Sequence, residues 1–187
     1  MLVDAATTTL QQAIELVGSL RENEYTRVSE MVPESSVGKH VRHVIDHYRI
    51  FLDALPNGPQ DTVIVVNYDK RARSPAIEGS PSVAIEALRD LQRVIRAKFG
   101  GALSLNASCG LVATVSTGQS GNRQGSLKQE DTQVVSSLGR ELWYCCMHAI
   151  HHYALIKVIC IEIGHPAPQH FGVAPSTLQY QATQQNA

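Results

Sequence analysis

The stretch "CCMHAIHHYALIK" at residues 145–157 places His148, His151 and His152 within five consecutive positions. A second stretch, "HVRHVIDHY" at residues 40–48, contributes three more histidines, so these two segments hold six of the chain's eight. Histidine is the commonest metal ligand and the side chain best suited to proton transfer near neutral pH. We therefore expect the functional site in these two segments, and we expect the helix faces that carry their histidines to pack against each other.

Helical spacing places these histidines on defined faces. Positions i, i+3, i+4 and i+7 share one face of an α-helix. His40, His43 and His47 follow that spacing, and His148 and His152 form an i, i+4 pair on the later helix. A pair of this kind and a third histidine from a facing helix fill three corners of a tetrahedral metal site and leave the fourth open, as in catalytic zinc sites.

Four amphipathic segments predict the fold. Apolar residues recur with helical spacing, and Ser35 or Ser36 is a suitable N-cap for the second segment. We expect an all-α four-helix bundle, because four such helices bury their apolar stripes against one another. Residues 61–80 are expected to be irregular, and a small extended or β-hairpin insertion is expected at 102–118, between the third and fourth helices. The expected helices lie within residues 5–22, 33–58, 81–99 and 133–163.

Composition limits the class of protein. Sixteen basic and seventeen acidic residues give a net charge of −1, which argues against nucleic acid and anionic membrane surfaces as partners. No apolar run reaches the roughly 18 residues of a membrane span, and no basic stretch marks a secretory signal. The cysteines do not follow a zinc or disulfide spacing, which predicts buried thiols in a cytoplasmic protein. They are Cys109, Cys145, Cys146 and Cys160.

The histidine spacing leaves three functions open. The first is a metalloenzyme with an open coordination position, and the second is a non-catalytic protein whose metal or ligand is fully enclosed. In the third, the histidines are structural or respond to pH without a metal. Six histidines are more than one metal can bind, so several must orient the ligands, carry protons or lie on the surface.

The two histidine segments also resemble a known family. "RHVIDHYRIFLDAL" is similar to the second-helix pattern of the DinB/YfiT-like family, and "MHAIHHYALI" is similar to its last-helix motif. The resemblance covers most of residues 5–163. It implies an up-down-down-up bundle, with one domain over residues 1–175 and a flexible tail over 176–187. Tyr153-Ala154-Leu155 departs from the family pattern that follows the final histidine.

The resemblance implies a metal site made by His43, His148 and His152, with His47 as the competing third ligand. It assigns no catalytic residue. Four further residues are candidates for orienting the ligands or lining a pocket, and Asp46 is a fifth, because it could accept the second N–H of a ligand imidazole. The four are His40, His151, Tyr68 and Arg71, of which the last could hold a carboxylate.

The implied activity is that of a divalent-metal-dependent enzyme, a hydrolase or a thiol S-transferase, with zinc or nickel as the metal. The implied partners are a small-molecule substrate, including a low-molecular-weight thiol, and a second copy of the chain in a homodimer. The alternative is a non-catalytic metal- or ligand-binding bundle.

Overall fold

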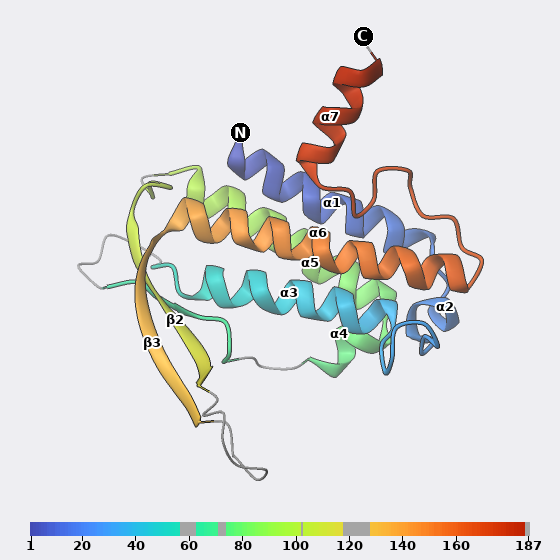
Figure 1. Cartoon of the computed structure of the whole chain (residues 1–187), viewed down its shortest axis with the longest axis horizontal. Helices are drawn as coiled ribbons and strands as arrows, with labels where there is room; N and C mark the ends of the chain where they lie inside the picture. The colour runs from blue at the N-terminus through green and yellow to red at the C-terminus, as the bar shows by residue number, and fades with distance from the viewer. Residues whose placement is uncertain (57–62, 71–73, 102, 118–127, 186–187) are drawn as a thin grey trace.

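Four long helices make up the body of the computed structural model, which describes residues 1–56, 63–70, 74–101, 103–117 and 128–185. They are α1 (Leu2–Ser19), α3 (Val37–Asp53), α5 (Pro81–Phe99) and α6 (Leu138–Glu162). Helix α1 packs against α5 and α6, and α3 packs against the same two helices from the other side. Figure 1 shows these helices side by side. Helix α6 therefore faces α3, and their histidine stripes meet.

The ends of these helices follow from local sequence. Ser36 is the N-cap of α3, and its Oγ accepts a hydrogen bond from the Lys39 amide at 3.1 Å. Ser137 caps α6 in the same way through the Arg140 amide at 3.2 Å. Helix α6 ends where Gly164 takes φ +72°, a left-handed conformation that glycine adopts without steric cost. These local signals fix the bounds of the two helices, α3 and α6, that carry the histidines.

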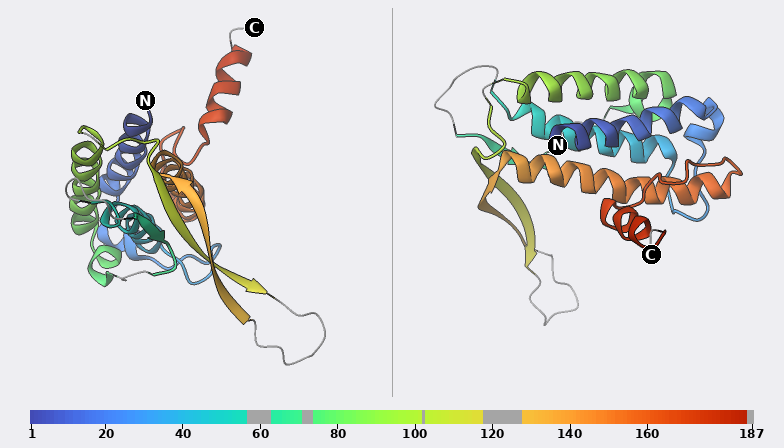
Figure 2. Two further views of the ribbon diagram at one scale, coloured as in Figure 1. Left: turned by 90° about the vertical axis from the view of Figure 1, so that its left-hand side faces the viewer. Right: turned by 90° about the horizontal axis from the view of Figure 1, so that it is seen from above.

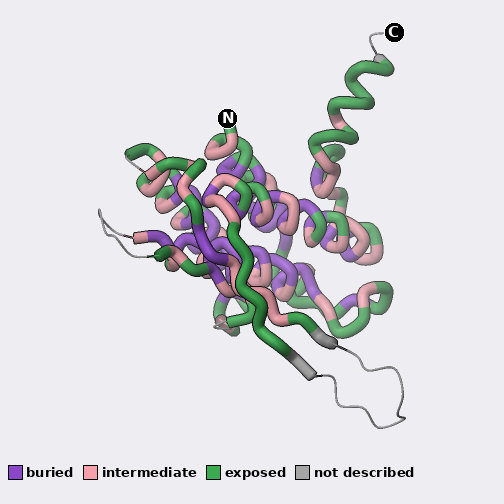
Figure 3. The backbone as a smooth tube through the Cα atoms, turned by 60° about the vertical axis from the view of Figure 1, so that its left-hand side comes forward, coloured by how far each residue is buried: buried purple, intermediate pink, exposed green. Residues whose placement is uncertain are grey.

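A three-stranded mixed sheet accompanies the helices, so the all-α prediction is wrong. The strand order is β1-β2-β3, with β1 (Val65–Asn67) parallel to β2 (Ser108–Thr117) and β2 antiparallel to β3 (Lys128–Ser137). In the register, Val65 lies opposite Gly110 and Ser108 opposite Ser137. The hairpin of β2 and β3 projects away from the helices (Figure 2), and β3 is exposed over residues 130–135 while β2 is buried or half-buried over residues 109–114 (Figure 3).

The correction has a physical cause. The sequence predicts an extended insertion that ends at residue 118, but the strand that pairs with β2 lies further on, in "KQEDTQVVSS". The sequence pattern of this segment favours a polar loop followed by the start of the last helix. Both faces of this strand are polar over most of its length, so the alternation that predicts a half-buried strand is absent. Strand β1 lies in the segment expected to be irregular and has only three residues. Long-range pairing with β2 makes it a strand.

Three short helices were also missed. Helices α2 (Glu22–Thr26) and α4 (Pro75–Gly79) have five residues each, too few to show helical periodicity. Helix α7 (Pro175–Gln185) forms where the sequence predicted a flexible tail over residues 176–187. Figure 1 shows α7 standing off from the four-helix body.

The core lies between the four long helices. Tyr25, Tyr48, Phe51 and Tyr153 are its largest members and are fully buried. Buried hydroxyls are usually hydrogen-bonded. The Tyr153 hydroxyl donates to the Thr9 carbonyl at 3.0 Å, and the Tyr25 hydroxyl donates to the Ile77 carbonyl at 2.9 Å. The packing holds α3 and α6 in one fixed relation.

Helix α6 is long and apolar enough, by length and composition alone, to cross a membrane. The core helix of a water-soluble protein passes the same test. Helix α6 contacts α1, α3 and β3, and its histidines lie against α3.

Gly38 provides a test of the close packing at the start of α3. A Cβ atom there would lie 2.1 Å from the Glu78 carbonyl oxygen and 2.9 Å from Tyr25 Cε1. We expect Gly38→Ala to lower the free energy of unfolding by about 3 kcal/mol, because the backbone of α4 must move to accept the methyl group. Urea denaturation measures the change.

Gly79→Ala is the matched control, because a Cβ at Gly79 meets nothing within 4 Å. Its effect should stay within about 1 kcal/mol. Equal destabilisation by both substitutions would contradict the close approach of α3 and α4.

Candidate histidine site

The six histidines of the two sequence stretches form one cluster between α3 and α6. His43 Nε2 lies 2.9 Å from His148 Nε2 across the helix interface. The ring of His47 stacks on the ring of His148, with centroids 4.1 Å apart. The ring of His152 lies 4.4 Å from that of His43 and 4.7 Å from that of His148. His151 is exposed at the edge.

Three of these histidines could bind one ion. His43, His47 and His148 each offer a ring nitrogen, and these atoms lie within 4.8 Å of one another. Two nitrogens on a tetrahedral zinc ion with bonds of 2.0–2.1 Å are about 3.3 Å apart, so the separations suit a shared metal. The competitor His47, and not His152, completes this group of three.

His47 has its tautomer set by its own helix. Its Nδ1 lies 3.1 Å from the His43 carbonyl oxygen, which can only accept a hydrogen bond. The neutral ring therefore carries its proton on Nδ1 and has an unprotonated Nε2, and neutral imidazole is the form that binds a metal. The Tyr68 ring stacks on His47, with centroids 5.4 Å apart and planes 12° apart.

His152 and His40 form a separate pair. Their Nδ1 atoms are 2.8 Å apart, and His40 Nε2 lies 2.8 Å from the Ser35 hydroxyl oxygen. Burial lowers the pKa of His152 to about 2, with further lowering from His43 and His148 nearby. Burial also lowers the pKa of His40, as does His151. Both rings are therefore neutral at pH 7.

The other candidates have varied positions. The carboxylate of Asp46, which the sequence suggested as a partner of a ligand imidazole, accepts a hydrogen bond from Arg42 Nη1 at 2.7 Å and forms an ion pair with it. The Tyr68 hydroxyl lies 3.7 Å from Cys145 Sγ. Burial raises the pKa of the Cys145 thiol well above its usual range, so the group is a buried thiol. Arg71 lies outside the described residues.

Sequence reasoning did not foresee the contacts of three polar groups, Ser35, Glu141 and Glu162. Glu141 lies on α6 seven residues before His148, is fully buried, and its Oε1 accepts hydrogen bonds from Ser136 and Arg140. Ser35 was considered only as a helix cap. Glu162, near the end of α6, received no role. In the sequence, the Ser35–His40 contact appears only as a serine five residues before a histidine, and the contacts of Glu162 appear only as an acidic residue near a helix end. Both patterns are common in sequences whose side chains make no such contacts.

Glu162 fixes the loop that leads into α3. Its carboxylate accepts hydrogen bonds from the Ser29 hydroxyl at 2.5 Å and from the Glu30 amide at 2.9 Å. The amide of Ser29 in turn donates to the Ser35 carbonyl at 2.8 Å. These bonds lower the pKa of the Glu162 carboxyl, the backbone bond from Glu30 contributing most. The loop beside His40 is therefore tied to the far end of α6.

Comparisons with known proteins give one informative match. The chain is 43% identical over 123 residues to FK506-binding protein 5 from Rhizopus delemar. The match covers 65% of this chain and 29% of that protein, so the chain spans less than a third of its relative. No family model matches the chain, and no solved structure matches it.

This match overturns the predicted family and function. A curated relative at this identity is named as an FK506-binding protein and not as a DinB-like protein, so the DinB/YfiT-like assignment is wrong. The metal-dependent hydrolase or thiol S-transferase inferred from that resemblance is wrong with it. Short histidine motifs on amphipathic helices recur by chance, whereas identity over 123 residues does not.

The role of Glu162 predicts a pH-dependent stability. A carboxyl whose pKa is lower in the folded state stabilises the fold above its unfolded pKa of about 4.3, and this contribution is lost as pH falls through the folded value. Glu162→Gln should lower Tm at pH 7, and the difference from wild type should shrink at pH 3. Thermal unfolding followed by circular dichroism measures both.

Glu30→Gln is the control, since Glu30 is exposed and contributes only its backbone amide to this network. It should match the wild type at both pH values. A Glu162→Gln deficit that is the same at pH 3 and pH 7 would contradict the role of the ionised carboxylate.

Proposed function

We propose that this chain is a metal-binding helical domain that holds one divalent ion, zinc or nickel, through His43, His47 and His148. The observation that carries the proposal is the convergence of three imidazole nitrogens within 4.8 Å from two facing helices. Imidazole nitrogens are good ligands for both metals. The proposal concerns binding and includes no hydrolase or transferase chemistry.

Local contacts support this ligand set. At 2.9 Å apart, the Nε2 atoms of His43 and His148 face each other, and one of them must carry a proton when no cation lies between them. A metal ion replaces that proton and satisfies both lone pairs. The His43 carbonyl oxygen holds the Nδ1 proton of His47, so Nε2 is the unprotonated nitrogen of its neutral ring.

Metal analysis tests the proposal. The untagged chain is treated with chelator, reloaded with zinc or nickel, desalted and analysed for metal. We expect one equivalent in wild type and its loss in His43→Ala, His47→Ala and His148→Ala, because three ligands are the fewest in typical protein zinc sites. The variant His151→Ala removes an exposed ring from the same helix and should retain the metal.

His152→Ala distinguishes the two ligand sets. Retention of metal in this variant and loss in His47→Ala would select the group that the geometry brings together. The reverse pattern would select His43, His148 and His152 instead. Absence of metal from the reloaded wild type would contradict the proposal.

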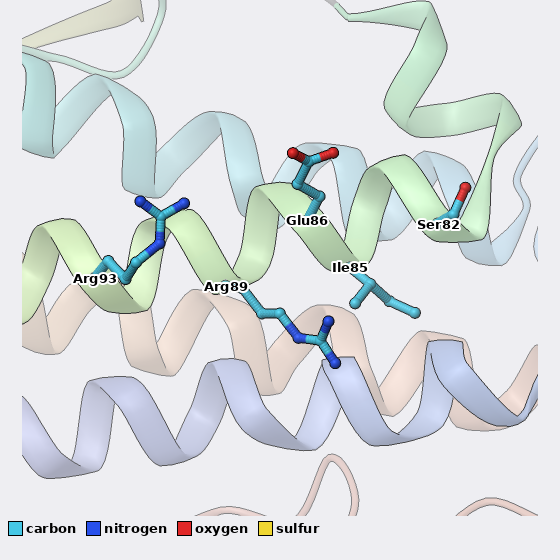
Figure 4. A pocket seen from close by; sticks show the side chains of 5 residues that line it. All are labelled: Ser82, Ile85, Glu86, Arg89 and Arg93. Carbon is cyan, nitrogen blue, oxygen red and sulfur yellow. The ribbon is translucent and has the colours of Figure 1, made fainter.

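A second candidate rests on the similarity to FK506-binding protein 5. That protein is named for binding FK506, and a small-molecule ligand of this kind is the alternative for the matched 65% of this chain. An open depression on α5 is one described hollow, lined by Ser82, Ile85, Glu86, Arg89 and Arg93 (Figure 4). Its charged lining is unlike the apolar pockets that hold most drug-sized ligands.

Titration with FK506 tests this candidate. FK506-binding proteins are typically peptidyl-prolyl isomerases, so the titration is paired with an assay of prolyl isomerisation in a short peptide. Saturable binding by isothermal calorimetry, with isomerisation that FK506 inhibits, would support an enzymatic role. If neither is seen, the ligand-binding activity belongs to the part of the relative that this chain does not match.

A further inference from the structure

A hydrogen-bonded chain of side chains runs beside the three proposed metal ligands and does not include them. The Ser35 Oγ lies 2.8 Å from His40 Nε2, and His40 Nδ1 lies 2.8 Å from His152 Nδ1. Ser35 is half-buried, whereas His40 is buried with 7% of its surface exposed. A hydroxyl, an imidazole and a third group that orients the imidazole are the parts of an activated serine nucleophile.

These two distances allow two arrangements of protons, and one of them suits a nucleophile. In that arrangement the Ser35 hydroxyl donates to His40 Nε2, and His40 Nδ1–H donates to His152 Nδ1. His152 then takes the role of the hydrogen-bond acceptor behind the imidazole, which a carboxylate fills in many serine enzymes. The rings of His43 and His148 lie 4.4 Å and 4.7 Å from His152 and hold it in orientation.

The loop presents Ser35 in a fixed position. Ser36 caps α3, which leaves the neighbouring Ser35 hydroxyl for His40. The Ser35 carbonyl accepts a hydrogen bond from Ser29, which Glu162 holds on its other side. Glu34 has φ +56°, a left-handed conformation that is uncommon outside glycine and persists only where the surroundings enforce it.

The serine also lies where a small molecule could reach it. Pro33 and Glu34, the two residues before Ser35, are exposed, and the exposed His151 ring lies 5.3 Å from that of His152. Ser35 immediately precedes the N-cap of the 17-residue helix α3. The positive end of the helix dipole stabilises negative charge at this position, as develops on an acyl oxygen under attack.

We propose that Ser35 is a nucleophile, with His40 as its general base and His152 as the residue that positions His40. The substrate class is small carboxylic esters. In the first step, Ser35 Oγ forms a bond to the acyl carbon and its proton passes to His40 Nε2. The ester C–O bond breaks, and the leaving alcohol takes that proton. Water then hydrolyses the seryl ester in the same manner and restores the serine.

A fluorophosphonate probe tests the nucleophile directly. Diisopropyl fluorophosphate forms an Oγ–P bond, its P–F bond breaks, and the serine proton passes to His40 as fluoride leaves. Intact-protein mass and peptide mapping follow the labelling. Chelator-treated protein is used, so the result is independent of the proposed metal site. We expect a single label on Ser35 in wild type, none in Ser35→Ala, and labelling at least about 100-fold slower in His40→Ala.

Matched variants separate chemistry from folding. Ser82→Ala removes an exposed hydroxyl on α5, far along the chain from Ser35, and should label like wild type. His152→Ala should slow labelling, whereas His152→Asn should restore it, because the amide oxygen takes the place of Nδ1 as acceptor. Thermal unfolding of each variant confirms that it folds. Wild type that stays unlabelled, or an equal rate in folded His40→Ala, would overturn the proposal.

Discussion

The packing of α3 against α6 is the constraint on which the rest of the candidate site depends. It brings two histidine stripes, more than 100 residues apart in the chain, into direct nitrogen-to-nitrogen contact. Buried polar atoms are costly unless they are hydrogen-bonded, and imidazoles facing each other can satisfy only one nitrogen with each shared proton. The cluster must therefore adopt matched tautomers, accept a cation, or both.

The contacts divide the cluster into two parts with different chemistry. On one side, His43, His47 and His148 place ring nitrogens within 4.8 Å of one another. On the other, His40 and His152 pair with each other, and Ser35 ends that chain of hydrogen bonds. A cluster that looks redundant in sequence thus contains one group suited to a cation and another suited to carrying a proton.

The similarity to FK506-binding protein 5 involves only part of a longer protein. The matched 123 residues cover 29% of that longer protein. A helical unit with its own buried core and its own histidine cluster can contribute a function separate from the one for which the longer protein is named.

The sequence by itself determined the approximate extent of the long helices and the two histidine faces, because periodicity and the Ser36 cap are local properties that need no partner element. The expected start of the last helix was five residues too early, because residues 133–137 lie in β3 and Ser137 caps α6. The tertiary structure alone decided that β1 pairs with β2, since three residues carry no periodic signal. It also placed ring nitrogens of His43, His47 and His148 within 4.8 Å of one another, because spacing along one helix cannot say which residues of the other it meets.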